Sequence, residues 1–463
     1  MKPDIAKKLL CLVVAACLAC FTACGGGGNS QDSADTSSSV ESNESVAVKD
    51  GSEWIEGLDN AGGRYNGKQF NIVSVSPTLF YDESDNPISR AISDRNGLLQ
   101  QYFDISINCI EKDAETIQDQ LGNAYDNGEA YADLICAPIS VLASLAADEL
   151  LENIYSLPYL DLSADYINKA ELDRQTVNNT AYMYSGGITN SLNAGVGIFY
   201  NKALVNAAGT DPVQLAKAGT LTWSSLLTMV QGVAERDAYG IDSLLPEAEL
   251  FVAVYGSSGE GLISAGNGEA AKSVYSGDAA KTTSNIMESI FKNPKYSAGY
   301  DAENAVRAFN NGNLGFIVAT MDSVSLFDDC KAEWGLIPLP KHSTEQTQYS
   351  SFLSNNALAV AVPRGCKDSA FSGFVLNALL AASANNVEEA LKTTYVNYHF
   401  WSNDAAVMLN VIDRTKKTDI GVAYSSIQEV ASVGTAVLRK EKNQKVSDDA
   451  LKAFDDFAAG LFY

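Results

Sequence analysis

Polar side chains flank several stretches that are expected to form β-strands, at the points where those strands begin or end. The expected strands are Phe70–Val75, Asp133–Ala137, Val196–Tyr200 and Leu314–Met321. The candidate ligand residues are the polar Tyr81, Asp82, Ser140, Asn190, Asn193 and Asp322, together with Met321, the last residue of the fourth strand. In open α/β sheets ligands bind beyond the carboxyl ends of the strands. Hydroxyl, amide and carboxylate groups there would hydrogen-bond to a small polar solute, and an aromatic ring would cover its apolar faces.

Each of these residues also has a purely structural interpretation. Asp and Asn occur in turns because their side chains hydrogen-bond to the nearby backbone. Asp322 would equally serve as the N-cap of a helix that follows its strand. The residue types therefore favour a binding site without separating ligand contacts from turn contacts.

Residues suited to catalysis are scarce. The chain has two histidines, His342 and His399, and neither has a partner at the spacing of a metal site. The sequence contains no GxSxG, and the glycine-rich run Gly256–Gly268 lacks the Lys-Ser/Thr of a phosphate-binding loop. Acidic pairs such as Asp328-Asp329 are expected on solvated faces at this overall charge. We therefore expect no catalytic residue, no metal and no cofactor, and an enzyme acting on surface glycans is the alternative.

Regular elements alternate in the first part of the chain. The strand at Phe70–Val75 is followed by a helix with Ile88, Ile92, Leu99 and Phe103 on one face. A strand at 105–110, a helix through residues 117–125 and the strand at 133–137 come next. This order predicts an α/β fold with a parallel sheet and right-handed crossovers.

The N-terminal residues predict export and lipidation. Lys2, Lys7 and Lys8 precede a short apolar run that ends in Phe21-Thr22-Ala23-Cys24. This run resembles a lipoprotein signal, in which residues 1–23 are removed and Cys24 is lipidated. Cys17 fits the same local pattern, and a plain secretory signal is the alternative. Residues 24–60, rich in Ser, Asp, Glu and Asn, are expected to form a flexible tether.

Charge and cysteine content limit the possible partners. Residues 1–23 carry three lysines and one aspartate, so their removal changes the net charge from −25 to −27. A surface this acidic excludes nucleic acid as a favoured partner. The remaining cysteines are widely spaced, and buried thiols or a disulfide are both possible. They are Cys109, Cys136, Cys330 and Cys366.

The order of several segments resembles that of bacterial extracellular solute-binding proteins, the ligand-capturing lipoproteins of ABC importers. The resemblance rests on YFDISI, AYADLICAP, a strand ending in Tyr200-Asn201-Lys202, the Thr222-Trp223 that opens a helix, WGLIPLP and NALAVAVP. In the helix that begins at Trp223, the apolar residues recur at three- and four-residue steps, and Gly240 is expected to end the element. The resemblance extends in order over residues 65–390.

The resemblance implies a two-lobed fold of the periplasmic-binding-protein type with hinge crossings. The expected divisions are 61–194 with 345–395 for the first lobe and 195–344 with 396–463 for the second. The chain would cross near Asn193–Val196, near Leu339–Tyr349 and near Tyr395. Members of the family often place an aromatic platform over the cleft, a role for Tyr398 and Trp401, although these residues would equally pack between helices.

The family resemblance also implies a function. A monomer held to the cell membrane by its lipid, on the extracytoplasmic face, would close around a small solute and deliver it to ABC permease subunits. An oligosaccharide is the favoured solute, while peptides and polyamines remain open. A sensing or adhesion lipoprotein of the same fold, without a transport partner, is the further alternative.

Overall fold

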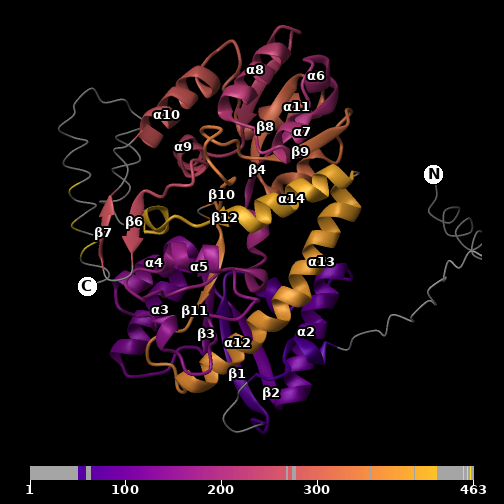
Figure 1. Ribbon diagram of the computed structural model, residues 1–463. Helices are drawn as coiled ribbons and strands as arrows, with labels where there is room; N and C mark the ends of the chain where they lie inside the picture. The colour runs from indigo at the N-terminus through magenta and orange to yellow at the C-terminus, as the bar shows by residue number, and fades with distance from the viewer. Residues whose placement is uncertain are drawn as a thin grey trace, which may run out of the picture. The chain divides into compact units, whose positions relative to one another are not determined.

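Two mixed α/β units form the described part of the chain in the computed structural model (Figure 1). The structure describes residues 51–58, 64–266, 269–273, 278–354, 356–400 and 402–424, together with the isolated positions 452, 456 and 459. The predicted signal segment, the lipidated Cys24 and Trp401 lie outside the described residues.

The first sheet has the strand order β11-β3-β1-β2. Strands β1 (Lys68–Ser74), β2 (Ile105–Glu111) and β3 (Leu134–Pro138) run parallel, and β11 (Leu358–Ala361) runs antiparallel to β3. Helices α2 (Pro87–Phe103) and α3 (Ala114–Asp126) connect the parallel strands. The predicted strand–helix–strand–helix–strand order and its parallel pairing are confirmed.

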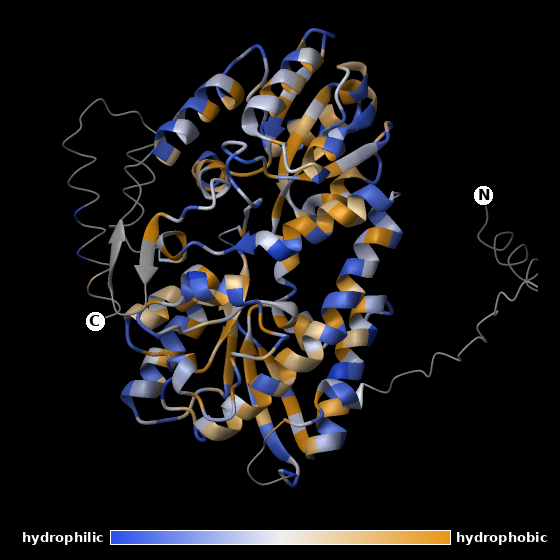
Figure 2. Cartoon of the chain, viewed as in Figure 1, coloured by the Kyte–Doolittle hydropathy of each residue, from blue (hydrophilic) through white to orange (hydrophobic). Residues whose placement is uncertain are grey.

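Helices cover both faces of this sheet. Phe70 and Ile72 of β1 pack in the cluster that contains α2 and α12 (Ser369–Asn385). Val73, next along β1, packs in the cluster that contains α3 and α4 (Ile139–Ala147). Successive side chains of a strand point to opposite faces, so β1 supplies both halves of the core. Figure 2 shows hydrophobic stretches, coloured orange, along the strands of this sheet.

The second sheet has the strand order β5-β8-β4-β9. Its strands are β4 (Val196–Asn201), β5 (Tyr239–Ser243), β8 (Leu314–Thr320) and β9 (Trp334–Pro338). Strand β4 is antiparallel to both of its neighbours, whereas β5 and β8 are parallel. Helices α8 (Trp223–Ala234) and α11 (Ala302–Asn310) pack against β5 and β8, and α14 (Asn403–Thr415) packs against β9.

Shorter elements complete the described chain. The helices among them are η1 (Ser52–Trp54), η2 (Pro77–Leu79), η3 (Ile154–Ser156), α5 (Lys169–Gln175), η4 (Gly187–Thr189), η5 (Ser191–Ala194), α6 (Lys202–Ala207), α7 (Pro212–Lys217), α9 (Glu247–Gly256), α10 (Asp278–Ile286), η6 (Met287–Phe291), η7 (Met321–Phe327), α13 (Val387–Thr394), η8 (Tyr395–His399) and α15 (Ile420–Ala423). The strands are β6 (Ile263–Gly266) and β7 (Glu269–Ser273), which form a hairpin, and β10 (Ser351–Phe352) and β12 (Lys416–Lys417).

Among the described residues, one helical run, Ser369–His399, is long and apolar enough to cross a bilayer. Of its most apolar window, 78% is buried inside the protein, which is the burial expected of a core helix.

Two sequence expectations are wrong. Gly240 does not end a helix: α8 ends at Ala234, and Gly240 lies in β5, where an added Cβ would come within 2.8 Å of the Val230 carbonyl oxygen. The tether prediction fails over residues 51–58, because η1 is helical and Ile55 is buried in the core beside α12. The apolar residues Trp54, Ile55 and Leu58 interrupt the polar composition there and supply the surface that packs.

A capping box holds the start of α8. The Thr222 hydroxyl accepts a hydrogen bond from the Ser225 amide at 3.2 Å, and the Ser225 hydroxyl accepts one from the Thr222 amide at 2.9 Å. Two otherwise unpaired amides are satisfied in this way, and α8 begins at Trp223 as predicted.

We expect Thr222→Ala to lower the free energy of unfolding by about 1 kcal/mol, because one amide of the first turn loses its acceptor. Chemical denaturation of the two proteins measures this difference. Thr228→Ala, on the exposed side of the same helix, is the control and should change stability less. Equal losses in the two variants would contradict a specific capping role.

Candidate functional site: the crossing between the two sheets

Three chain segments lie side by side where the backbone passes from one sheet to the other. Tyr184 still pairs with Val360 beside the first sheet, and eleven residues later Gly195 pairs with Leu353 just before β4 begins. The Leu353 amide donates to the Lys417 carbonyl at 3.0 Å, so the Leu353 segment contacts both the Gly195 segment and β12. The backbone groups of the crossing therefore satisfy one another.

Asn193, Tyr395 and Asp322 meet beside this crossing. The Tyr395 hydroxyl donates to Asn193 Oδ1 at 2.7 Å, which joins η8 to η5. Burial, and then the nearby Asp322 carboxylate, raises the pKa of the Tyr395 phenol. Asp322 is exposed, and one carboxylate oxygen accepts a hydrogen bond from the Thr320 hydroxyl. Its other oxygen has no hydrogen-bond donor among the described residues, so it is available to a solute hydroxyl.

Met321 and Asn190 support this corner from inside. The Met321 side chain is fully buried, and its amide donates to the Gly195 carbonyl at 2.9 Å. Asn190 is buried in a left-handed conformation with φ of 50°, and its amide oxygen has no hydrogen-bond partner among the described residues. The backbone position of Asn190 thus follows turn chemistry, while its unpaired oxygen is a polar group that a water or a solute would satisfy.

Ser140 lies beside the Leu353 segment of the crossing. It is the second residue of α4, which directly follows β3, and it lines a small depression together with Leu353, Ser354 and Thr418. The Ser354 amide donates to the Ala194 carbonyl at 2.9 Å, which connects this depression to η5. Ser140 and Asn193 therefore flank a common set of backbone hydrogen bonds.

Tyr81 and Asp82 lie apart from this group. They line a depression of about 570 Å³ formed by the loop after β1, by α2 and by β2, all within the first unit. Tyr81 is 66% exposed and donates to Glu83 Oε1 at 2.7 Å. Asp82 accepts from both the amide and the hydroxyl of Ser84, which is the turn chemistry that competes with a ligand role.

The aromatic residues that follow α13 include Tyr395, Tyr398 and Trp401. Tyr395 is the one that contacts the site, and the sequence analysis does not select it as a site residue. Tyr398 is 60% exposed on η8, and Trp401 is not described. Val387, Leu391 and Tyr395 are all buried and recur every four residues, so they share one face of a helix. This spacing is the signal that would have distinguished Tyr395 from Tyr398.

The four described cysteines are free thiols. Burial raises the pKa of Cys136 to about 12 and that of Cys109 to about 11. In the described residues, no group of three or more His, Cys, Asp or Glu side chains could hold a metal ion.

The Tyr395–Asn193 hydrogen bond gives a double-mutant prediction. We expect Tyr395→Phe to lower the free energy of unfolding by about 1 kcal/mol, because the half-buried Asn193 oxygen loses its donor. Adding Asn193→Ala should then cost about 1 kcal/mol less than it does alone. Tyr398→Phe, on the exposed side of η8, is the control. Strictly additive effects in denaturant titrations would contradict the contact.

The chain matches known proteins over most of its length. The family model described as "Bacterial extracellular solute-binding protein" matches residues 98–405. No curated protein matches the chain.

Two solved structures share the two-lobed fold. The galacto-N-biose-/lacto-N-biose I-binding protein of the ABC transporter from Bifidobacterium longum is 15% identical, with a TM-score of 0.58 over 86% of this chain and 98% of the other. The GacH receptor of Streptomyces glaucescens GLA.O, solved unliganded and with acarbose, is 14% identical, with a TM-score of 0.53 over the same shares. Since the family model covers well over half of the sequence, the chain belongs to the bacterial extracellular solute-binding proteins.

Proposed function

We propose that this extracellular solute-binding protein captures an oligosaccharide beside the crossing and delivers it to an ABC permease. The observation that carries the proposal is the convergence of Asn193, Asp322 and Tyr395 where the chain passes between the two sheets. An amide, a carboxylate with an unused oxygen and a neighbouring phenol are groups that bind sugar hydroxyls. The two structural relatives are described as sugar or acarbose receptors, which supports the same solute class.

The remaining features of the proposal follow from the sequence. Residues 1–23 are a signal peptide, and Cys24 carries the lipid that holds a monomer on the extracytoplasmic face. The lobes comprise 61–194 with 345–395 and 195–344 with 396–463, and the ordered segment 51–58 joins the first lobe. Asn190, Asn193, Met321, Asp322 and Ser140 form or support the site, Tyr398 lies at its rim, and Tyr81 and Asp82 provide an outer subsite. The ligand role that the family resemblance implies for Trp401 concerns a residue outside the described ones. The protein has no catalytic role.

A solute panel tests the substrate class. We expect neutral di- and oligosaccharides to raise the melting temperature of the purified protein, because a ligand that binds only the folded state stabilises it by mass action. Peptides and polyamines should leave the melting temperature unchanged. Stabilisation by a polyamine or a peptide alone would reject the sugar assignment. Release of shorter products from a glycan during incubation would instead favour the enzyme alternative.

Asp322→Asn tests the site once a stabilising sugar is found. The variant keeps the shape of the side chain but loses a charged acceptor, so we expect the dissociation constant to rise at least tenfold, or about 1.4 kcal/mol. Asp329→Asn removes an exposed carboxylate seven residues further along and should leave the dissociation constant unchanged. Isothermal titration calorimetry measures both. Equal affinities in the two variants would exclude Asp322 from the site.

A further inference from the structure

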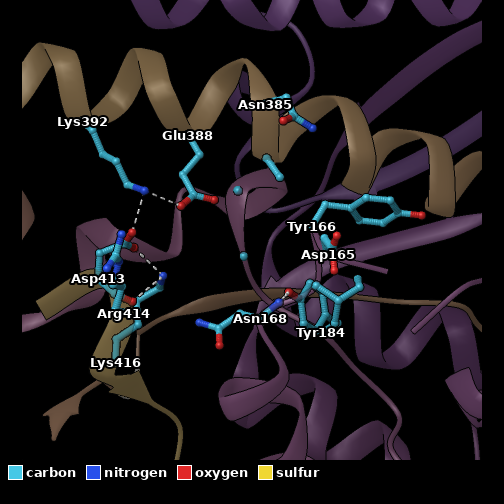
Figure 3. Close-up of a pocket in the computed structure, with 14 residues that line it drawn as sticks. Asp165, Tyr166, Asn168, Tyr184, Asn385, Glu388, Lys392, Asp413, Arg414 and Lys416 are labelled. Carbon is cyan, nitrogen blue, oxygen red and sulfur yellow. Dashed lines mark hydrogen bonds and ion pairs between the residues drawn. The ribbon is translucent and has the colours of Figure 1, made fainter. Parts of the chain in front are cut away.

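A second cavity, of about 480 Å³, lies between α13, the end of α14 and the segment 165–187 (Figure 3). It shares no residue with the depressions that contain Ser140 or Tyr81. Charged side chains from three elements line it: Glu388 and Lys392 from α13, Asp413 and Arg414 from α14, and Lys416 from β12.

Asp413 is the centre of an ion-pair network at the edge of this cavity. Its Oδ1 accepts from Lys416 Nζ at 2.6 Å and its Oδ2 contacts Lys392 Nζ at 2.7 Å. Lys392 also contacts Glu388 Oε1 at 2.8 Å, one turn earlier on α13. Figure 3 shows these contacts as one continuous set of dashed lines.

The network joins elements that belong to different parts of the fold. Helix α13, which carries Lys392 and Glu388, packs against α2 beside the first sheet. Helix α14, which carries Asp413 in its last turn, packs against β9 of the second sheet, and its Ile412 lies against Gly195 and Gly197. Lys416 is in β12, which pairs with β10 at the crossing. Asp413 thus connects both sheets to the crossing strand.

Burial strengthens the attraction between the paired charges of this network, because little solvent screens them. Asp413 and Lys416 are nearly fully buried, with side-chain exposures of 6% and 5%. Burial alone would raise the pKa of Asp413, but Lys416 and Lys392 lower it. Burial likewise works against a charged Lys416, but Asp413, Glu171 and Glu388 outweigh it and raise the pKa of the ammonium group. Loss of one member leaves the others buried and uncompensated.

Glu171 of α5 is a further buried acid that interacts electrostatically with the network. Its side chain is fully buried on α5, and neither carboxylate oxygen has a hydrogen-bond partner among the described residues. Burial raises the pKa of Glu171, and Lys416 partly offsets that effect. Lys416 therefore pairs with Asp413 and also interacts electrostatically with Glu171, an acid on another element.

We propose that the Asp413 network is a latch that holds the two lobes in their present relation when no solute is bound. The adjoining cavity provides room for α13 and the end of α14 to shift when the lobes move, which a close-packed interface would resist. No ion pair of the latch includes Asn193 or Asp322, so its proposed action is on the lobe equilibrium. The inference goes beyond solute capture and does not depend on which solute is bound.

The test measures the distance between the lobes in the full chain without any solute. Spin labels are attached through bio-orthogonal residues at Gln118 on α3 and Ser224 on α8, both exposed, so that the native thiols remain unlabelled. Pulsed electron paramagnetic resonance gives the distance distribution. We expect Asp413→Asn to shift and widen the distribution relative to the unsubstituted chain, because both lysines lose their common anion.

The matched control is Asp404→Asn on the same helix. Asp404 pairs with Lys217 of α7, which packs on the second sheet, so this ion pair does not involve the crossing. Its loss should leave the distance distribution unchanged. A change of equal size in Asp404→Asn would overturn the latch, because any ion pair on α14 would then have the same effect.

Lys392→Met keeps the proposal falsifiable if Asp413→Asn does not fold. Lys392 is 25% exposed, so its loss is easier to accommodate, and the distribution should widen in the same direction. Circular dichroism establishes which variants are folded. A folded Lys392→Met or Asp413→Asn with the unsubstituted distribution overturns the proposal. Because no solute is added, a failed sugar panel would leave this result intact.

Discussion

The crossing between the two sheets is constrained by backbone hydrogen bonding. A chain that leaves one sheet for another exposes amides and carbonyls that cost free energy if they are buried without partners. Here Gly195 pairs with Leu353, and Leu353 donates to Lys417, so three distant segments supply the missing partners. Gly195 and Gly197 have no side chains, which lets Ile412 of α14 pack directly against the first of these segments.

The site and the ion-pair network both depend on that arrangement. Asn193 lies two residues before Gly195, and Met321 is fixed by its hydrogen bond to the Gly195 carbonyl, so Asp322 is brought to the same corner. Tyr395 reaches Asn193 from η8, while Lys392, one turn earlier on α13, contacts Asp413. One helical run therefore connects the solute-facing corner with the buried charges, and a movement of α13 would affect both.

Prediction from the sequence succeeded where local patterns dominate. The strands and helices from Lys68 to Pro138 follow the periodicity of their apolar residues, and α8 begins where Thr222-Trp223 predicts. Prediction from the sequence failed where packing against residues far away in the chain determines the local structure. Ile55 is buried because α12, more than three hundred residues away in the chain, provides its surface. The sequence pattern predicts a helix end at Gly240. In the structure Gly240 lies in β5 and closely approaches Val230 of α8, a contact that depends on how α8 packs on the sheet.

The sequence by itself determined the α/β class, the order of the elements and membership of a solute-binding family, because these depend on residue periodicity and on the succession of short motifs. Only the tertiary structure decided which polar residues meet. It joined Asn193 to Tyr395 across 202 positions, and it separated Tyr81 from both by turning the loop after β1 toward α2. Lys392 and Asp413 are likewise paired by helix packing. Such contacts depend on the relative placement of whole elements, which no local pattern of residues encodes.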